Sequence, residues 1–197
     1  MLLNLRYLKA AATMVAKDET RYYLNGVAVQ GVMNKGVFII STDGHRLIAF
    51  RQSAELPFDV DPFEIIIPAA IIDAIKLHKT EDFGELEHVE GHKWSLSYIN
   101  SPKLTFEAIH GVFPDWRRVV PKETNGEVAQ YNPVLLASFC KAKKTLGLKS
   151  PDMVAVAHNG PGPALVTLGG ESDNYFGVIM PFRATFDIIT QSPAWAQ

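Results

Sequence analysis

The stretch Ser41-Thr42-Asp43-Gly44-His45-Arg46-Leu47 lies between two apolar runs and sets the pattern from which the rest of the chain can be interpreted. The flanking residues 37–40 and 46–50 are rich in β-branched and aromatic side chains, which is typical of strands. Asp43-Gly44 supplies turn chemistry between them, because glycine adopts positive φ without steric cost and aspartate bonds to nearby backbone. We therefore predict a hairpin here, preceded by another strand at residues 22–29.

A helix is expected before these strands. Asn4 is a suitable N-cap for a helix over about residues 5–17, because its side chain can accept a hydrogen bond from the first turn. Apolar residues recur on one face of that helix. These residues are Leu5, Leu8, Ala12 and Val15.

The order of a helix followed by strands recurs twice. The second unit has an apolar run at 64–68, a helix over about 69–78, and strands near 86–89, 94–99 and 104–109. The third unit has a strand at 127–131, a helix capped by Asn132 with Pro133 in its first turn, and strands near 153–157, 164–168 and 175–180. Residues 121–126 read as a linker, which gives one domain at 1–121, a half-sized one at 122–183, and a tail at 184–197.

Composition limits the class of protein. The chain has 197 residues, of which 47% are hydrophobic and 20% charged, as in soluble globular proteins. The sequence offers no membrane span and no signal peptide. The single cysteine, Cys140, excludes an intrachain disulfide and favours a reducing compartment, so we expect a cytoplasmic protein.

The three predicted helices carry basic residues on their polar faces. The formal net charge is −2, so any attraction for nucleic acid must come from how the charges are distributed. One interpretation is that these are solvated helix faces. The other is a surface that contacts DNA phosphates without reading bases. The candidate residues are Arg6, Lys9, Lys17, Lys76, Lys79, Lys141 and Lys144.

Four stretches, far apart in the sequence and in the same order, together resemble one protein family. They are Thr20-Arg21-Tyr22-Tyr23-Leu24-Asn25-Gly26, Ser41–Leu47, Phe113-Pro114-Asp115-Trp116-Arg117-Arg118 and Val178-Ile179-Met180-Pro181-Phe182-Arg183. The chain resembles the bacterial beta sliding clamp family, the DNA polymerase III beta subunit, over about residues 4–183. The resemblance implies an α+β DNA-clamp fold built from three βαβββ units, with helices on one face and antiparallel sheets on the other.

The resemblance also implies a pocket that accepts short linear peptides, in which a glutamine is followed by spaced hydrophobic residues. The matching positions are Leu24, Thr42, Gly44, His45, Arg46, Leu47, Pro114, Arg118, Val119, Val178, Met180, Pro181, Phe182 and Arg183. The apolar members of this set, taken one at a time, are also compatible with ordinary core positions at strands. The arginines favour the pocket, since arginine is rarely buried without a role.

The sequence departs from the family pattern at two residues and in its length. Trp116 replaces a usual tyrosine, and Phe182 replaces a common methionine. Residues 4–121 resemble a complete second domain and 127–183 only the closing half of a third, so a first domain is expected to be absent. Clamp rings contain twelve βαβββ units, and four copies of a three-unit chain would supply that number.

Other motifs are better explained without catalysis or metal. Ser41, Asp43 and His45 crowd on one strand and turn, whereas the members of a triad converge from separate segments. His88 and His92 flank a turn at Gly91, where a spacing of four does not align side chains. We expect no enzyme activity and no cofactor.

The expected function is that of a sliding-clamp-like processivity factor in DNA replication. It would surround double-stranded DNA without sequence preference and tether DNA polymerase, a clamp loader or repair proteins through their peptides, as a homo-oligomer. The alternative is an adaptor or decoy that keeps the pocket, forms no ring and modulates replication.

Overall fold

A computed structural model describes residues 1–17, 20–52, 62–78, 82–149, 153–169 and 173–183. The α-helices are α1 (Leu5–Ala11), α2 (Ala69–Ala74) and α3 (Pro133–Leu146), and the 3₁₀ helices are η1 (Ala12–Met14), η2 (Tyr22–Leu24) and η3 (Trp116–Val119). The strands are β1 (Leu2–Asn4), β2 (Gly26–Val32), β3 (Gly36–Thr42), β4 (Arg46–Gln52), β5 (Phe63–Pro68), β6 (Phe83–Glu90), β7 (Lys93–Ser97), β8 (Leu104–Glu107), β9 (Ala155–Ala157), β10 (Ala164–Thr167) and β11 (Tyr175–Ile179). The predicted tail and residue Lys79 lie outside the described residues.

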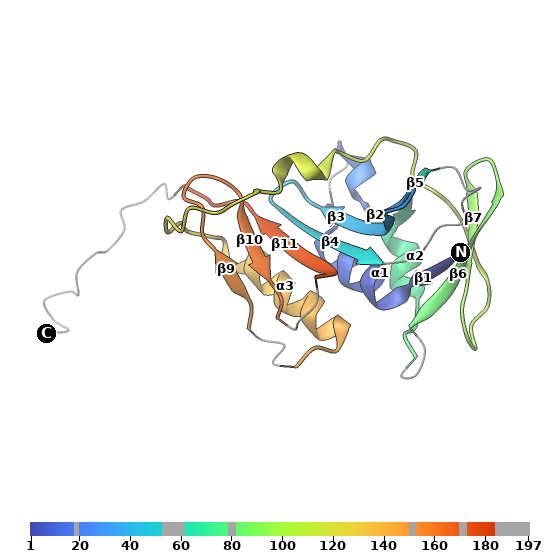
Figure 1. The fold of residues 1–197 in the computed structure, drawn as a ribbon. Helices are drawn as coiled ribbons and strands as arrows, with labels where there is room; N and C mark the ends of the chain where they lie inside the picture. The colour runs from blue at the N-terminus through green and yellow to red at the C-terminus, as the bar shows by residue number, and fades with distance from the viewer. Residues whose placement is uncertain (18–19, 53–61, 79–81, 150–152, 170–172, 184–197) are drawn as a thin grey trace, which may run out of the picture.

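Two antiparallel sheets form the fold. The larger sheet has seven strands in the order β5-β2-β3-β4-β11-β10-β9, and the smaller has four in the order β1-β6-β7-β8. The α-helices lie on one side of the larger sheet (Figure 1). The architecture is therefore α+β, with helices on one face and antiparallel sheets on the other.

The first two units exchange strands. The first unit is β1-α1-β2-β3-β4 and the second is β5-α2-β6-β7-β8. The strand before α1 pairs with β6 of the second unit, with Asn4 opposite Phe83. The strand before α2 pairs with β2 of the first unit, with Pro68 opposite Gly26. Each unit thus completes the sheet of the other.

The third unit joins the first within the large sheet, where its strand β11 lies beside β4. β11 pairs antiparallel with β4, which makes one continuous sheet from segments far apart in the chain. The predicted strand at 127–131 is wrong, because these residues have no strand geometry in the structure. A β-strand needs a neighbouring ladder, and the described chain provides none at this position.

All three helices begin where the sequence predicts, and the first two end sooner than predicted. The Asn4 side chain accepts a hydrogen bond from Tyr7 N at 3.0 Å, and Asn132 accepts one from Val134 N at 2.9 Å. The first helix tightens into η1 after Ala11, and α2 ends at Ala74. The Lys9 ammonium donates to the carbonyls of Ile72, Asp73 and Ile75, so it satisfies groups that the end of α2 leaves without helical partners.

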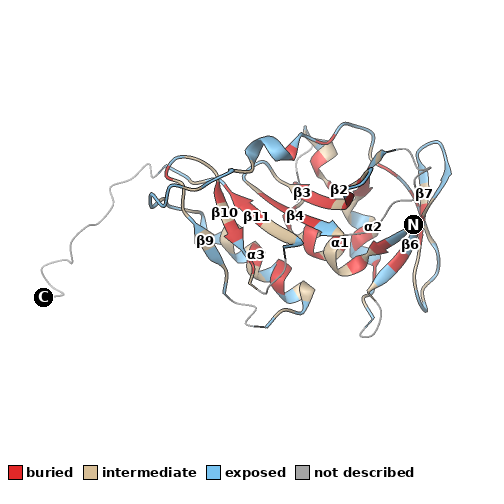
Figure 2. Ribbon diagram, viewed as in Figure 1, coloured by how far each residue is buried: buried red, intermediate tan, exposed pale blue. Residues whose placement is uncertain are grey.

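Alternate strand residues face opposite sides of the large sheet, and a cluster of buried apolar residues lies on each side. Figure 2 shows the buried positions along the strands. On the helix side, Ile39, Ile48 and Phe50 pack with buried residues of α1 and α3. Tyr7 stacks on Phe50, with ring centroids 4.8 Å apart, and burial raises the pKa of the Tyr7 phenol. On the other side, a smaller apolar cluster includes Ile40 and lies beneath η2 and η3.

Phe139 anchors α3 in the core, and its removal tests the packing of the third unit. The side chain is fully buried, and a Cβ atom added at Gly177 of β11 would lie 2.2 Å from the Phe139 ring. We expect Phe139→Ala to lower the free energy of unfolding by about 3–5 kcal/mol in urea titrations, because it leaves a cavity. The control Lys141→Ala, at an exposed position of the same helix, should change it by less than about 0.5 kcal/mol. Equal losses for the two variants would contradict this role.

Candidate functional site: a pocket at the junction of the first and third units

A pocket of about 310 Å³ lies where β4 meets β11. Its walls come from η2, the β3–β4 turn, the segment leading into η3, and the end of β11. The lining residues are Arg21, Tyr23, Leu24, Thr42, Gly44, His45, Arg46, Leu47, Pro114, Asp115, Trp116, Val119, Val178 and Met180.

The floor of the pocket belongs to the smaller apolar cluster. Leu24, Leu47 and Val178 are each at most 3% exposed. Val119 and Met180 are 43% and 37% exposed, so they offer apolar surface to a ligand. Buried apolar residues with a few exposed ones above them are the usual construction of a site for small ligands or peptide side chains.

Trp116 is a buried residue that forms part of one wall of the pocket. Its indole Nε1 donates to Gln30 Oε1 at 3.1 Å, and its ring lies near Phe38, with centroids 6.0 Å apart. The Arg117 guanidinium lies over the Trp116 ring at 4.3 Å from its centroid. The Trp116 side chain is therefore held by a hydrogen bond and by its contacts with Phe38 and Arg117.

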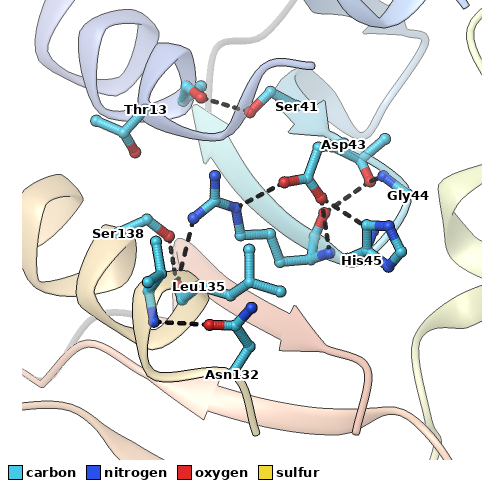
Figure 3. A network of polar contacts seen from close by, with 12 residues as sticks. Thr13, Ser41, Asp43, Gly44, His45, Asn132, Leu135 and Ser138 are labelled. Atoms are coloured by element: carbon cyan, nitrogen blue, oxygen red, sulfur yellow. Dashed lines mark hydrogen bonds and ion pairs between the residues drawn. The ribbon is translucent and has the colours of Figure 1, made fainter. Parts of the chain in front are cut away.

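The β3–β4 turn is built by side chains that bond to its own backbone (Figure 3). Asp43 Oδ1 accepts from the amides of His45 and Arg46 at 2.9 and 3.1 Å. Thr42 Oγ1 donates to the Arg46 carbonyl at 2.7 Å and accepts from Gly44 N at 3.0 Å. Gly44 has φ +91°, which other residues adopt only with strain. His45 is consequently presented to solvent at the tip.

Arg46 connects the first unit to the third. Its Nε lies 3.0 Å from Asp43 Oδ2, an ion pair held by charge without a well-aligned hydrogen bond. Its Nη1 donates to the Leu135 carbonyl of α3 at 3.4 Å. Figure 3 shows Leu135 in the first turn of α3, with Asn132 capping that turn. Arg46 therefore serves the junction as well as the pocket wall.

The end of β11 is fixed to the same turn. Met180 N donates to the His45 carbonyl at 2.8 Å, which continues the ladder between Val178 and Leu47. Neither unit alone contains the complete pocket, so its shape depends on the contact between them.

Most of the residues predicted for the pocket do line it, and four do not. The four are Arg118, Pro181, Phe182 and Arg183. Arg118 is exposed on η3, and Arg183 is exposed at the end of the described chain. The structure also adds Arg21, Tyr23, Asp115 and Trp116 to the lining. All four lie within the sequence stretches that carry the family resemblance. Their closeness in sequence to the predicted pocket residues could have identified them.

The predicted DNA-contact residues divide into two groups. Arg6 and Lys9 are engaged inside the fold, with Arg6 Nε 2.5 Å from Asp82 Oδ1 and Lys9 bound to the end of α2. Lys17, Lys76, Lys141 and Lys144 are exposed. Lys17 and Lys141 also line a single hollow between the helices. Lys143, which neighbours them in sequence, is 5% exposed and donates to the Met153 carbonyl at 2.7 Å.

Ser41, Asp43 and His45 have separate structural roles. The Ser41 hydroxyl donates to the Ala11 carbonyl on the helix side, and Asp43 caps the turn (Figure 3). Among the described residues, no group of three His, Cys, Asp or Glu side chains is placed to hold a metal ion. No helix in the described ranges is long and apolar enough to cross a membrane.

Comparison with known proteins assigns the family. Residues 5–115 match the family described as DNA polymerase III beta subunit, central domain. This chain belongs to that family. It is 30% identical over 118 residues to the beta sliding clamp of Pseudomonas aeruginosa, covering 59% of this chain and 31% of the relative. With the beta sliding clamp of Caulobacter vibrioides it is 27% identical over 157 residues, covering 78% and 41%.

Solved structures show the same fold. The DNA polymerase sliding clamp of Bacillus subtilis superposes with a TM-score of 0.72 at 14% identity, covering 93% of this chain and 64% of that one. The DNA polymerase III subunit beta of Pseudomonas aeruginosa gives 0.68 at 20% identity, covering 93% and 66%. The chain thus has the sliding-clamp fold. It spans between about a third and two fifths of the length of these curated relatives.

The Thr42 hydroxyl tests how the turn holds the pocket rim of this family member. Thr42→Val keeps the shape of the side chain and removes two hydrogen bonds, so we expect a loss of about 1–2 kcal/mol in the free energy of unfolding. Urea titration of this variant beside Thr105→Val, at an exposed position on β8, measures the difference. No loss relative to the control would show that the hydroxyl does not hold the turn.

Proposed function

We propose that this protein is a sliding-clamp-like processivity factor that surrounds duplex DNA without sequence preference and tethers DNA polymerase and other partners. The observation that carries the proposal is the pocket at the junction of the first and third units, formed by the stretches that resemble the family. Family membership supports the same role. The protein would act by binding and positioning, without an enzymatic step.

The pocket suits a short peptide that carries spaced apolar side chains. The floor of Leu24, Leu47 and Val178 can bury such side chains, and the exposed His45 side chain supplies a polar contact at the rim. Arg183 and Phe182 lie beyond the end of β11 and would contact the peptide outside the pocket. A small groove of this kind gives modest affinity, which suits exchange among several partners.

The helix side is the proposed DNA face. Lys17, Lys76, Lys141 and Lys144 project from the helices or their ends and can neutralise phosphates. The contribution of Arg6 and Lys9 would be smaller, because both already serve the fold. Electrostatic contact with the backbone alone would explain binding without sequence preference.

For the architecture, we propose one complete clamp-type domain at residues 1–121 and half of a second at 122–183. A homo-oligomer is needed to surround DNA, because both sheets of a single copy are open in the described chain, with edge strands β1 and β8 in one and β5 and β9 in the other. With three units per chain, four copies would supply the twelve units that the resemblance implies for a ring.

Replacing Met180 tests the pocket, and Met33, a methionine of similar exposure elsewhere in the chain, provides a matched control. We expect Met180→Ala to weaken binding of a labelled peptide with a glutamine and spaced hydrophobic residues by about 5–30-fold, measured by fluorescence anisotropy. His45→Ala and Arg183→Ala should also weaken it. Met33→Ala, at a similarly exposed position on the β2–β3 turn, should leave affinity unchanged. Equal affinity for all variants would reject the pocket assignment.

A charge-matched pair of double variants tests the DNA face. Lys17→Glu with Lys141→Glu changes two residues of the same hollow. Lys35→Glu with Lys122→Glu alters net charge equally at exposed sites outside the helices. We expect only the first pair to weaken duplex binding, with a salt dependence shallower by about two phosphate contacts. Equal effects of both pairs would indicate bulk charge alone.

Retention on DNA separates the clamp from the adaptor or decoy. A ring should stay on closed circular DNA and slide off once the circle is cut. Peptide binding without any retention on circular DNA would favour the adaptor, which keeps the pocket and modulates replication.

A further inference from the structure

The segment that precedes each helix occupies the same place in all three units. Two residues before the N-cap, a carbonyl accepts a hydrogen bond from the last strand of the same unit or from the chain just after it, through a side chain in the first unit and the backbone in the other two. In the first unit Leu2 O accepts from Gln52 Nε2 at 3.0 Å, and in the second Ile66 O accepts from Ile109 N at 2.9 Å. In the third, Gln130 O accepts from Phe182 N at 3.0 Å.

The backbone at the caps repeats as well. Asn4 has φ −73° and ψ 112°, and Asn132 has φ −63° and ψ 119°. Both side chains accept from the first turn of their helix. Asn132 therefore has the same extended backbone as Asn4, and the Gln130 carbonyl is held by a hydrogen bond as the Leu2 carbonyl is.

Within the described ranges, the third unit alone lacks a partner for the segment before its helix. In the first two units the strand before the helix pairs with the strand that follows the other unit's helix, as Asn4 does with Phe83 and Pro68 with Gly26. In the described chain, residues 127–131 join no ladder, and β9 pairs only with β10. The six residues 121–126 that precede this unit are too few to hold another unit. An open strand edge is a template for pairing with another chain.

Exposed apolar side chains lie where such a partner would sit. Val134 is 72% exposed in the first turn of α3, and Met153 is 71% exposed just before β9. The corresponding contact between the first two units joins Arg6, two residues after its cap, to Asp82, immediately before β6. Val134 is likewise two residues after its cap, so its expected neighbour is the chain just before a partner's β9. Contact between these two side chains across a pair of copies would remove apolar surface from water.

We propose that two copies of this chain exchange the segments that precede α3, so that residues 130–132 of each copy pair antiparallel with β9 of the other. In the register of the first two units, Asn132 lies opposite the beginning of the partner's β9, and Val134 packs against the partner's Met153. The contact is self-complementary and closes with two-fold symmetry. The dimer completes across its axis the half domain that each copy carries.

The exchange goes beyond the proposed DNA and peptide binding, because it would hold equally in a ring or in an adaptor. Two such dimers contain the four chains of the proposed ring. Native mass measures the exchange, whereas peptide binding and retention on circular DNA measure the proposed function, so each proposal has its own measurement.

Light scattering over a concentration series, with matched variants, tests the exchange. We expect a stable even-numbered mass for the unaltered chain. Val134→Asp should weaken association at least tenfold, although an acidic residue in the first turn favours the helix itself. Met153→Asp should do the same. Val112→Asp, at a valine 83% exposed outside the third unit, should leave the mass unchanged.

The double variant Val134→Arg with Met153→Asp provides a rescue. It places across the axis the same charge pair that Arg6 and Asp82 form within the chain, so we expect it to associate more tightly than Met153→Asp alone. A monomer at all concentrations would overturn the proposal. So would an unchanged mass for Val134→Asp, an equal loss for Val112→Asp, or no rescue by the double variant.

Discussion

The backbone ladder between β4 and β11 is the contact on which the site depends. It runs from Arg46 opposite Ile179 to Phe50 opposite Tyr175, and it joins segments separated by more than half of the chain. Hydrogen bonds of this kind are directional, so they fix the distance and the register between the two units. The side chains of Leu47 and Val178, which are opposite each other in the ladder, are thereby placed together on the pocket floor.

Arg46 shows how closely the junction and the pocket are linked. Its guanidinium lies against Asp43 on one side and reaches the Leu135 carbonyl on the other, while its backbone forms part of the ladder. A charge with restricted solvent access in this position is stabilised by several partners at once. The prediction that an arginine at the pocket has a role is consistent with this geometry, although the role in the structure is to hold two units together.

Helix caps and turns, which depend on residues close together in the chain, could be predicted from the sequence. Asn132 and Pro133 mark the start of α3, and Asp43-Gly44 marks the β3–β4 turn, because caps and turns satisfy nearby backbone groups. The pocket residues could be located only through the family resemblance, since the stretches that form them are distant in sequence. The apolar residues of the pocket could be interpreted as core or as pocket lining, and the two interpretations are compatible. Leu24 and Leu47 belong to a buried cluster whose surface is the pocket floor.

The errors arose where distant groups decide the structure. β1 is only three residues long and is defined by its pairing with β6, so periodicity gave no sign of it. Residues 127–131 have the composition of a strand but no ladder in the described chain. The basic pattern of the helices likewise could not reveal that Lys9 satisfies the end of α2 or that Lys143 is buried against Met153.

The recurring carbonyl contact before each helix has a consequence for how such proteins change over evolution. Each unit contains both the segment that it lends and the sheet edge that must be filled, so neighbouring units are interchangeable in principle. A gene could lose or gain one unit at a time, and under the proposed exchange the remaining open edge would pair with another copy. Chains of different length could then use the same strand pairing between units, within one chain or between two chains.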